Sequence, residues 1–190
     1  MTTVLSPILP LLIVYAAAGL ILSLAVHVLS FFDITLGGES LFFALHVGIF
    51  PLWMIVVLIM QRAMTGMTVG SGWGFQGNAK LFRIFFAGCP VWIKVMTMGF
   101  FVYAFVNFVV FVFLAPSANV QGTASPIMWH GFSGHWMAFY SAGLAMLVTS
   151  YRIGLDNLRP QCPNGHAVAW GDRFCATCGA TLSARVQNGL

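Results

Sequence analysis

The chain has 190 residues, of which 59% are hydrophobic and only 6% are charged, and its mean hydropathy is +0.92. These values exclude a soluble domain and predict an all-α integral membrane protein. A formal net charge of +4 would suggest a nucleic-acid partner in a soluble protein, but in a membrane protein it more often reports basic residues on the cytoplasmic side. Charged residues divide equally between 1–150 and 151–190, which predicts a membrane body followed by a small polar tail.

Four apolar runs are long enough to cross a bilayer. They cover residues 8–32, 41–61, 91–115 and 127–151. At about 1.5 Å per residue in a helix, each run is sufficient for a hydrocarbon core of roughly 30 Å. The sequence therefore predicts a transmembrane domain of four helices over residues 1–152.

Residues 62–90 form the longest connection between these runs and are predicted to be a cytoplasmic loop. The glycine-rich first half lacks the lysine motif of a phosphate-binding loop. The second half interleaves Lys80 and Arg83 with apolar residues, which suits an amphipathic helix in the membrane interface with its cationic tips toward the head groups. An early start of the third span would explain the same residues, and both interpretations stay open.

The distribution of lysine and arginine predicts the orientation in the membrane. If the N-terminus is cytoplasmic, the two outer loops carry only Asp33 and Glu39 as charged residues. All basic residues then fall on the cytoplasmic side: Arg62, Lys80, Arg83, Lys94, Arg152, Arg159, Arg173 and Arg185. This positive-inside pattern predicts that both termini are cytoplasmic, in a bilayer that we expect to be a bacterial inner (plasma) membrane.

Three cysteines and one histidine near the C-terminus have the spacing of a metal site. Cys162 is followed by His166, and Cys175 by Cys178, so that two short turns offer two ligands each. A tetrahedral Zn²⁺ ion is bound by such pairs when a short β-hairpin brings them face to face. Residues 160–183 therefore predict a small metal-dependent domain, whose core we expect Trp170 and Phe174 to cover.

This stretch resembles the zinc ribbon family, which usually has C-x2-C at both turns. Gly165 stands where the second cysteine would fall, and His166 is its substitute. The resemblance is limited to residues 162–182 and implies a structural Zn²⁺ with no open position for catalysis. It also implies a recognition surface. The few, mixed charges of the tail do not form a nucleic-acid footprint, so a protein is the expected partner.

A layer of histidines is predicted in the outer half of the membrane. His27, His46 and His135 each lie about five residues inside the outer end of a span, and Asn107 belongs to the same half. His130 lies nearer the outer surface. Its i+5 spacing from His135 turns it about 140° away, so that one helix would not direct both inward. Ionisable groups inside a bilayer are costly and usually face a partner or a cavity.

Three interpretations of this histidine layer stay open. The histidines only hold the helices in register, or two of them ligate a haem iron or a second metal ion such as copper, or they handle protons or other ions. No catalytic constellation occurs elsewhere, so we expect no enzyme. The expected function is that of an accessory or adaptor subunit with a membrane or cytosolic protein partner, with a homo-oligomer as a further arrangement. The alternative is a redox or ion-handling protein.

Overall fold

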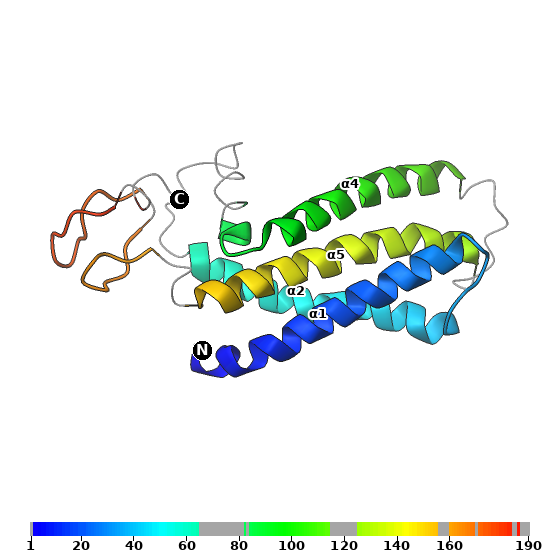
Figure 1. Cartoon of the computed structure of the whole chain (residues 1–190), viewed down its shortest axis with the longest axis horizontal. Coiled ribbons are helices and arrows are strands. Elements are labelled where there is room, and N and C mark those ends of the chain that lie inside the picture. The colour runs from blue at the N-terminus through cyan, green and yellow to red at the C-terminus, as the bar shows by residue number, and fades with distance from the viewer. Residues whose placement is uncertain are drawn as a thin grey trace.

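The computed structural model describes residues 2–64, 82, 84–114, 125–155, 160–169, 171–183 and 186. These residues form four long helices, α1 (Thr2–Ser30), α2 (Gly38–Met64), α4 (Val91–Leu114) and α5 (Pro126–Ile153), which confirm the all-α class. The helices alternate in direction, so the N-terminus of α1 and the C-terminal end of α5 lie at the same end of the bundle (Figure 1). We call this the proximal end, and the opposite end, where α1 leads into α2, the distal end.

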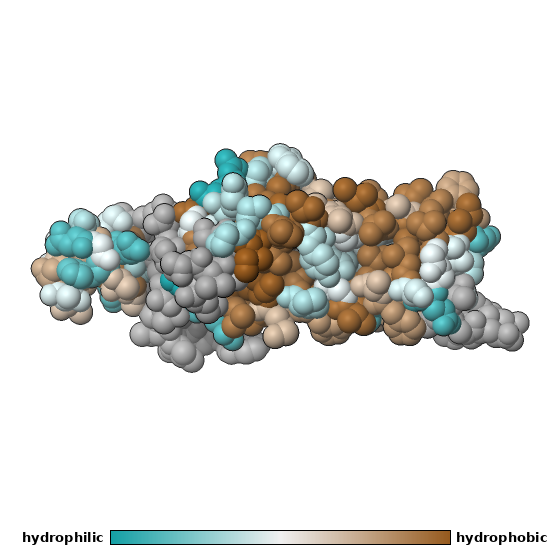
Figure 2. All heavy atoms as spheres, turned by 90° about the horizontal axis from the view of Figure 1, so that it is seen from below, coloured by the Kyte–Doolittle hydropathy of each residue, from teal (hydrophilic) through white to brown (hydrophobic). Residues whose placement is uncertain are grey.

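Three of the described helices are long and apolar enough to cross a membrane. These segments are Pro7–Ser30 in α1, Gly38–Ala63 in α2 and Val91–Phe113 in α4, with mean hydropathies of 2.4, 2.4 and 2.2. Large apolar side chains are exposed along α1, α2 and α4, and many of them are visible on the face in Figure 2, whereas the small lobe beyond the proximal end is largely polar there. Because an apolar surface of this extent favours lipid over water, the structure suits a membrane protein.

The helix α5 is the centre of the bundle and packs against α1, α2 and α4. Its side chains are buried almost continuously between Trp129 and Ser150, so neighbouring helices surround them. Small residues permit this close packing, since a Cβ atom on Gly19 of α1 would lie 2.3 Å from Cε1 of Tyr140. Because α5 is surrounded by the other helices, it needs a less apolar surface. It carries more glycine than each of the other helices and as many serines as α1.

The helix bounds lie within a few residues of the predicted spans, except that α1 begins at Thr2 rather than at residue 8. At its C-terminus, α1 ends in a Schellman motif. Asp33 adopts a positive φ of 58°, and the backbone N–H of Ile34 donates to the carbonyl oxygen of Leu29 at 3.1 Å. This turn reverses the chain and allows α2 to return beside α1.

The connection between α2 and α4 is described only near its C-terminal part, where residues 84–86 are helical. The hydroxyl of Thr149 on α5 donates to the carbonyl oxygen of Phe85 at 3.0 Å, which fixes this turn to the proximal end of the bundle. Lys80 and Arg83, the predicted interface residues, lie outside the described residues. The amphipathic interface helix therefore stays a prediction.

Residues 160–169 and 171–183 form the small lobe beyond the proximal end, which we call the metal lobe (Figure 1). Its described residues contain no strand. In place of the predicted β-hairpin there are two isolated antiparallel bridges, Gln161 with Ala167 and Phe174 with Thr181. Each bridge closes one tight turn, which leaves too few residues to extend a ladder of hydrogen bonds.

The core of the metal lobe differs from the predicted one. It consists of Cys162, Cys175, Leu182 and Val186. The side chain of Phe174 is 60% exposed, so the prediction that it covers the core is wrong. Successive side chains of an extended backbone point to opposite faces, and the neighbouring Cys175 already occupies the inner face. Trp170 lies outside the described residues.

Candidate functional site

Each ligand-bearing turn of the metal lobe contains a glycine with a positive φ, whose N–H donates to the carbonyl of the first cysteine. In the first turn, the N–H of Gly165 donates to the carbonyl oxygen of Cys162 at 2.9 Å, and Gly165 has a φ of 81°. In the second turn, the N–H of Gly179 donates to the carbonyl oxygen of Cys175 at 2.8 Å, and its φ is 69°. Glycine adopts a positive φ without steric cost, so both turns form where the sequence places a glycine close after the first ligand.

The two turns bring four ligand atoms together. The ligand atoms of Cys162, His166, Cys175 and Cys178 all lie within 4.8 Å of one another. The Sγ atoms of Cys162 and Cys178 are 3.7 Å apart, and Nδ1 of His166 lies 3.5 Å from Cys162 Sγ. Zn–S bonds of about 2.3 Å in a tetrahedral centre require sulfur atoms about 3.8 Å apart. The residues therefore fit a Zn²⁺ ion, which His166 would bind through Nδ1.

The chemistry of the donor set also favours Zn²⁺. Three thiols and one imidazole suit zinc better than they suit the hard cations Mg²⁺ and Ca²⁺. Hydrogen bonds from the backbone N–H of Ala180 and from the side-chain amide of Asn164 lower the pKa of the Cys178 thiol to about 6. Because the thiolate is the form that binds a metal, the lowered pKa of Cys178 favours metal binding.

The second candidate cluster lies inside the bundle near its distal end. His27 of α1 is buried, and its Nδ1 atom lies 2.7 Å from Oγ of Ser133 on α5. The hydroxyl of Ser133 donates to the carbonyl oxygen of His130 at 3.1 Å, so its oxygen accepts from His27 Nδ1–H. The hydroxyl of Tyr103 on α4 then donates to His27 Nε2. Both nitrogens of this neutral imidazole are therefore hydrogen-bonded within the protein.

His130 repeats this arrangement from the opposite helix. Its Nδ1 atom lies 3.0 Å from Oγ of Ser30, and the hydroxyl of Ser30 donates to the carbonyl oxygen of His27 at 2.6 Å. The two imidazole rings stack, with centroids 4.5 Å apart and 29° between their planes. Each histidine thus donates to a serine of the facing helix, and that serine donates to the carbonyl of the other histidine. We call His27, Ser30, His130 and Ser133 the His–Ser brace.

Asn107 connects α4 to the same end of the bundle. Its side chain is buried, and Nδ2 donates to the carbonyl oxygens of His130 and Gly131, both at 3.1 Å. An amide inside a membrane is costly unless it is paired. Here both amide hydrogens have acceptors, so Asn107 and Tyr103 together attach α4 to the His–Ser brace.

The structure separates the other predicted histidines from His27. His46 of α2 accepts a hydrogen bond at Nδ1 from Nε1 of Trp136 at 3.2 Å, whereas His135 is exposed. No hydrogen bond or ring contact among the described residues joins His27 to His46 or His135. The partner of His27 is instead His130, which faces away from His135 on the same helix.

Sequence reasoning misses Ser30 and Ser133 as partners of the histidines. The signal that could have found them is a repeated His-x2-Ser spacing, at 27–30 and at 130–133, because residues three apart share a helix face. Tyr103 lies four residues before Asn107, so the two share a face of α4, which the sequence predicts to look into the bundle. Its contact with His27 depends on how α4 is rotated against α1.

The described residues therefore form two sites with different chemistry: a cluster outside the bundle that fits a metal ion, and a buried polar network that joins three helices. Any assignment of function depends on these two features and on the surfaces around them. Comparison of the chain with models of protein families, with curated proteins and with solved structures finds no match.

Proposed function

We propose that this chain is an accessory or adaptor subunit of a membrane assembly. In this proposal the helices hold the chain in the bilayer, and the metal lobe binds a cytosolic protein. The observation that carries the proposal is the exposed aromatic ring of Phe174 on a lobe that is otherwise largely polar. Aromatic residues are enriched at the centres of protein interfaces because they bury a large apolar area at a low cost in conformational entropy.

The position of Phe174 within the lobe supports this role. Its backbone is paired with Thr181, and the next residue, Cys175, points into the lobe as a candidate metal ligand. The ring is thus held on a rigid backbone, yet it adds little to the core of the lobe. A fixed and exposed aromatic ring with so small a part in folding is well explained by a partner that covers it.

We place the metal lobe in the cytosol, as a zinc ribbon with a structural Zn²⁺, and propose that α5 crosses the bilayer with the other three helices. The 28 residues of α5 are long enough at about 1.5 Å each. Arg62, Lys94 and Arg152 lie at the proximal end, and Asp33 and Glu39 lie at the distal end. The positive-inside rule then puts both termini in the reducing cytoplasm, where thiols remain free to bind metal.

A photo-reactive amino acid at position 174 tests the proposal in the intact membrane. We expect one discrete cross-linked protein, which should also co-purify with the full chain when that protein is itself used as bait. Because a central aromatic contact is worth about 2 kcal/mol or more, Phe174→Ala should weaken this co-purification about thirtyfold while the zinc content stays the same. The same probe at Ala167, exposed on the other turn, is the matched control. A purified chain that is monodisperse, without partners and active alone would refute the proposal.

The His–Ser brace favours a second candidate function, the handling of protons or other ions within the membrane. Hydrogen bonds run continuously from Tyr103 through His27 and Ser133 to the carbonyl oxygen of His130. A histidine that connects two hydroxyl groups in an apolar region can accept and release a proton along such a chain. Haem ligation is less well supported, because both nitrogens of His27 already have partners.

Reconstitution of the chain in liposomes tests this second candidate. We expect a proton flux that is lost when His27 and His130 are both replaced by alanine, while circular dichroism reports an unchanged helix content. A flux that survives the double replacement, or a wild-type chain without any flux, would eliminate the candidate. An absorption spectrum and elemental analysis of the same sample would detect haem or a second metal ion and so reopen the redox alternative.

A further inference from the structure

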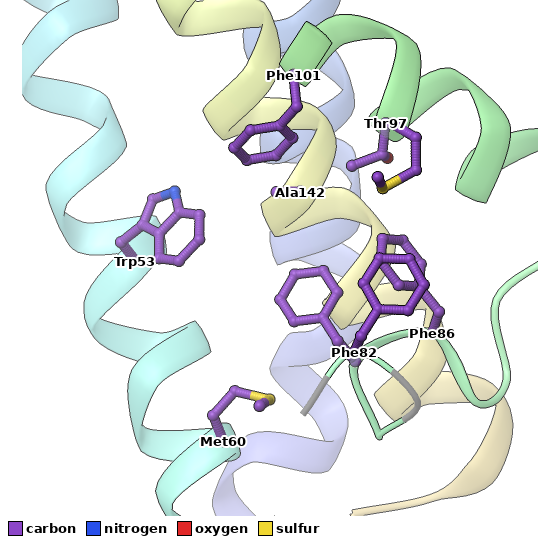
Figure 3. Close-up of a pocket in the computed structure, with 9 residues that line it drawn as sticks. Trp53, Met60, Phe82, Phe86, Thr97, Phe101 and Ala142 are labelled. Carbon is purple, nitrogen blue, oxygen red and sulfur yellow. The ribbon is translucent and has the colours of Figure 1, made fainter. Parts of the chain in front are cut away.

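A cavity of about 400 Å³ lies between α2 and α4 in the proximal half of the bundle. Figure 3 shows Trp53 and Met60 on the side of α2, Phe101 on the side of α4, and Ala142 of α5 between them. The ring of Phe86 belongs to the helical turn that closes the cavity toward the proximal end. The volume falls in the range of small-molecule sites, roughly 300–1,000 Å³.

The lining of this cavity is apolar, and its walls belong to the outer surface of the bundle. Met98 lines the cavity and is 41% exposed, and Met54, next to Trp53, is 68% exposed. In a membrane, hydrocarbon fills such a space, because water there would find almost no hydrogen-bond partners. The distance along α2 from Trp53 to Met60, about 10 Å at 1.5 Å per residue, suits part of an acyl chain better than a compact polar group.

Positive charge at the proximal mouth of the cavity indicates which lipid head group would accompany the acyl chain. Nζ of Lys94 lies 5.9 Å from the centroid of the Phe86 ring, which itself lines the cavity. Arg62 lies in the last turn of α2, and Arg152 lies in the last turn of α5. Both acidic residues in the described part of the bundle lie at the distal end. A phosphate group at the mouth would therefore meet cations without a nearby carboxylate from these helices.

We propose that the cavity binds one acyl chain of an anionic phospholipid from the proximal leaflet, and that Lys94 contacts its phosphate. The acyl chain would extend toward Trp53 and lie against Ala142. Since α2 and α4 each pack on α5, the bound lipid would connect two helices across the gap between them. This site is separate from the metal lobe and from the His–Ser brace, and it does not depend on the adaptor role.

Quenching of tryptophan fluorescence by brominated lipid tests the proposal on the full chain. The chain is reconstituted in phosphatidylcholine bilayers that contain a small fraction of phosphatidylglycerol or phosphatidylcholine with brominated acyl chains. The contribution of Trp53 is obtained by difference from Trp53→Phe. One cation near the membrane surface favours an anionic lipid by about fivefold, so phosphatidylglycerol should quench Trp53 at about one fifth of the mole fraction required for phosphatidylcholine. Lys94→Gln should abolish this difference.

Two substitutions that each introduce a leucine separate the cavity from the general lipid surface. Ala142→Leu fills the cavity and should remove the preferential quenching of Trp53, whereas Gly99→Leu adds its side chain where no atom lies within 4 Å and should preserve it. If circular dichroism shows that Ala142→Leu does not fold, Met98→Phe narrows the cavity from its exposed edge. Equal quenching of Trp53 by the two lipids overturns the proposal. So does a preference for phosphatidylglycerol that remains in Ala142→Leu. A cross-link from position 142 to a helix of another protein also overturns it, since that helix would occupy the cavity.

Discussion

The metal lobe and the helical bundle are held together in opposite ways. In the lobe, four side chains at fixed spacing converge on one point, and the apolar core around them consists of only a few residues. In the bundle, a continuous core runs along α5, and the side chains of His27 and Asn107 form hydrogen bonds between helices. The lobe therefore depends on a single centre, whereas the bundle distributes its stability over many contacts. A change in one region should have little effect on the other.

Removal of a metal ligand should have the largest effect and should be confined to the lobe. Cys175→Ser replaces a buried thiol of the cluster with a poor zinc ligand. Zinc binding contributes about 10–16 kcal/mol to the folding of small zinc domains, so we expect the lobe to unfold. Elemental analysis should show the loss of zinc, and limited proteolysis should cut within residues 160–183 while the helices remain protected.

The matched control for this experiment is Cys89→Ser, because Cys89 is a free thiol outside the cluster. It should retain both the zinc and the resistance to protease. If Cys175→Ser also melted the helices, the two regions would not be independent, and the comparison above would fail.

Crowding at the contact between Gly19 and Tyr140 should destabilise the bundle and spare the lobe. In Gly19→Val, the added Cβ atom would lie 2.3 Å from Cε1 of Tyr140, whose hydroxyl donates to the carbonyl oxygen of Leu45 at 3.0 Å. Overpacking of this kind costs about 1–3 kcal/mol, and thermal unfolding in detergent should report it while the zinc content stays the same. Gly99→Val, at an open position on α4, should remain within about 0.5 kcal/mol of the wild-type chain.

Loss of the His27 side chain should lower the free energy of unfolding by less than overpacking at Gly19 does. A comparison with His135 distinguishes the observed cluster from the predicted histidine layer. His27→Ala removes the hydrogen bonds to Ser133 and Tyr103. At about 0.6 kcal/mol per bond in a membrane protein, the free energy of unfolding should fall by about 1 kcal/mol. His135→Ala should have almost no effect, because this side chain is exposed. Equal losses for the two variants would contradict the division of the histidines into separate environments.

The sequence predicted the convergence of the four candidate metal ligands, because their spacing is a local property. The approximate bounds of the helices were predictable too, since hydropathy reports which residues can lie in lipid. The exposure of Phe174 was not predicted, although neighbouring side chains of an extended backbone point to opposite faces and Cys175 points inward. In a core this small, one buried ligand fixes the direction of its neighbour.

The partners of the histidines were harder to predict because depth along a helix does not fix its rotation. The sequence predicts one depth for His27, His46 and His135, but in the structure His27 is level with His130, which lies five residues before His135 on α5, about 7.5 Å away at 1.5 Å per residue. His130, which the sequence places nearer the surface, is the residue that stacks on His27. The repeated His-x2-Ser spacing carries this information, since two equal motifs on antiparallel helices can face each other in a reciprocal pair.

Removal of the Tyr103 hydroxyl should have the smallest effect on stability and should show which tautomer His27 adopts. Tyr103→Phe should cost about 0.6 kcal/mol. In ¹⁵N NMR spectra, we expect His27 to carry its proton on Nδ1, facing Ser133, and the shift of Nε2 to change when its donor is lost. Tyr15→Phe, which removes a 2.8 Å hydrogen bond to the carbonyl oxygen of Gly48, should cost a similar free energy without moving either nitrogen signal of His27. A proton on both nitrogens in the wild-type chain would mean that the brace holds a charged imidazole, and this result would strengthen the ion-handling function over a purely structural one.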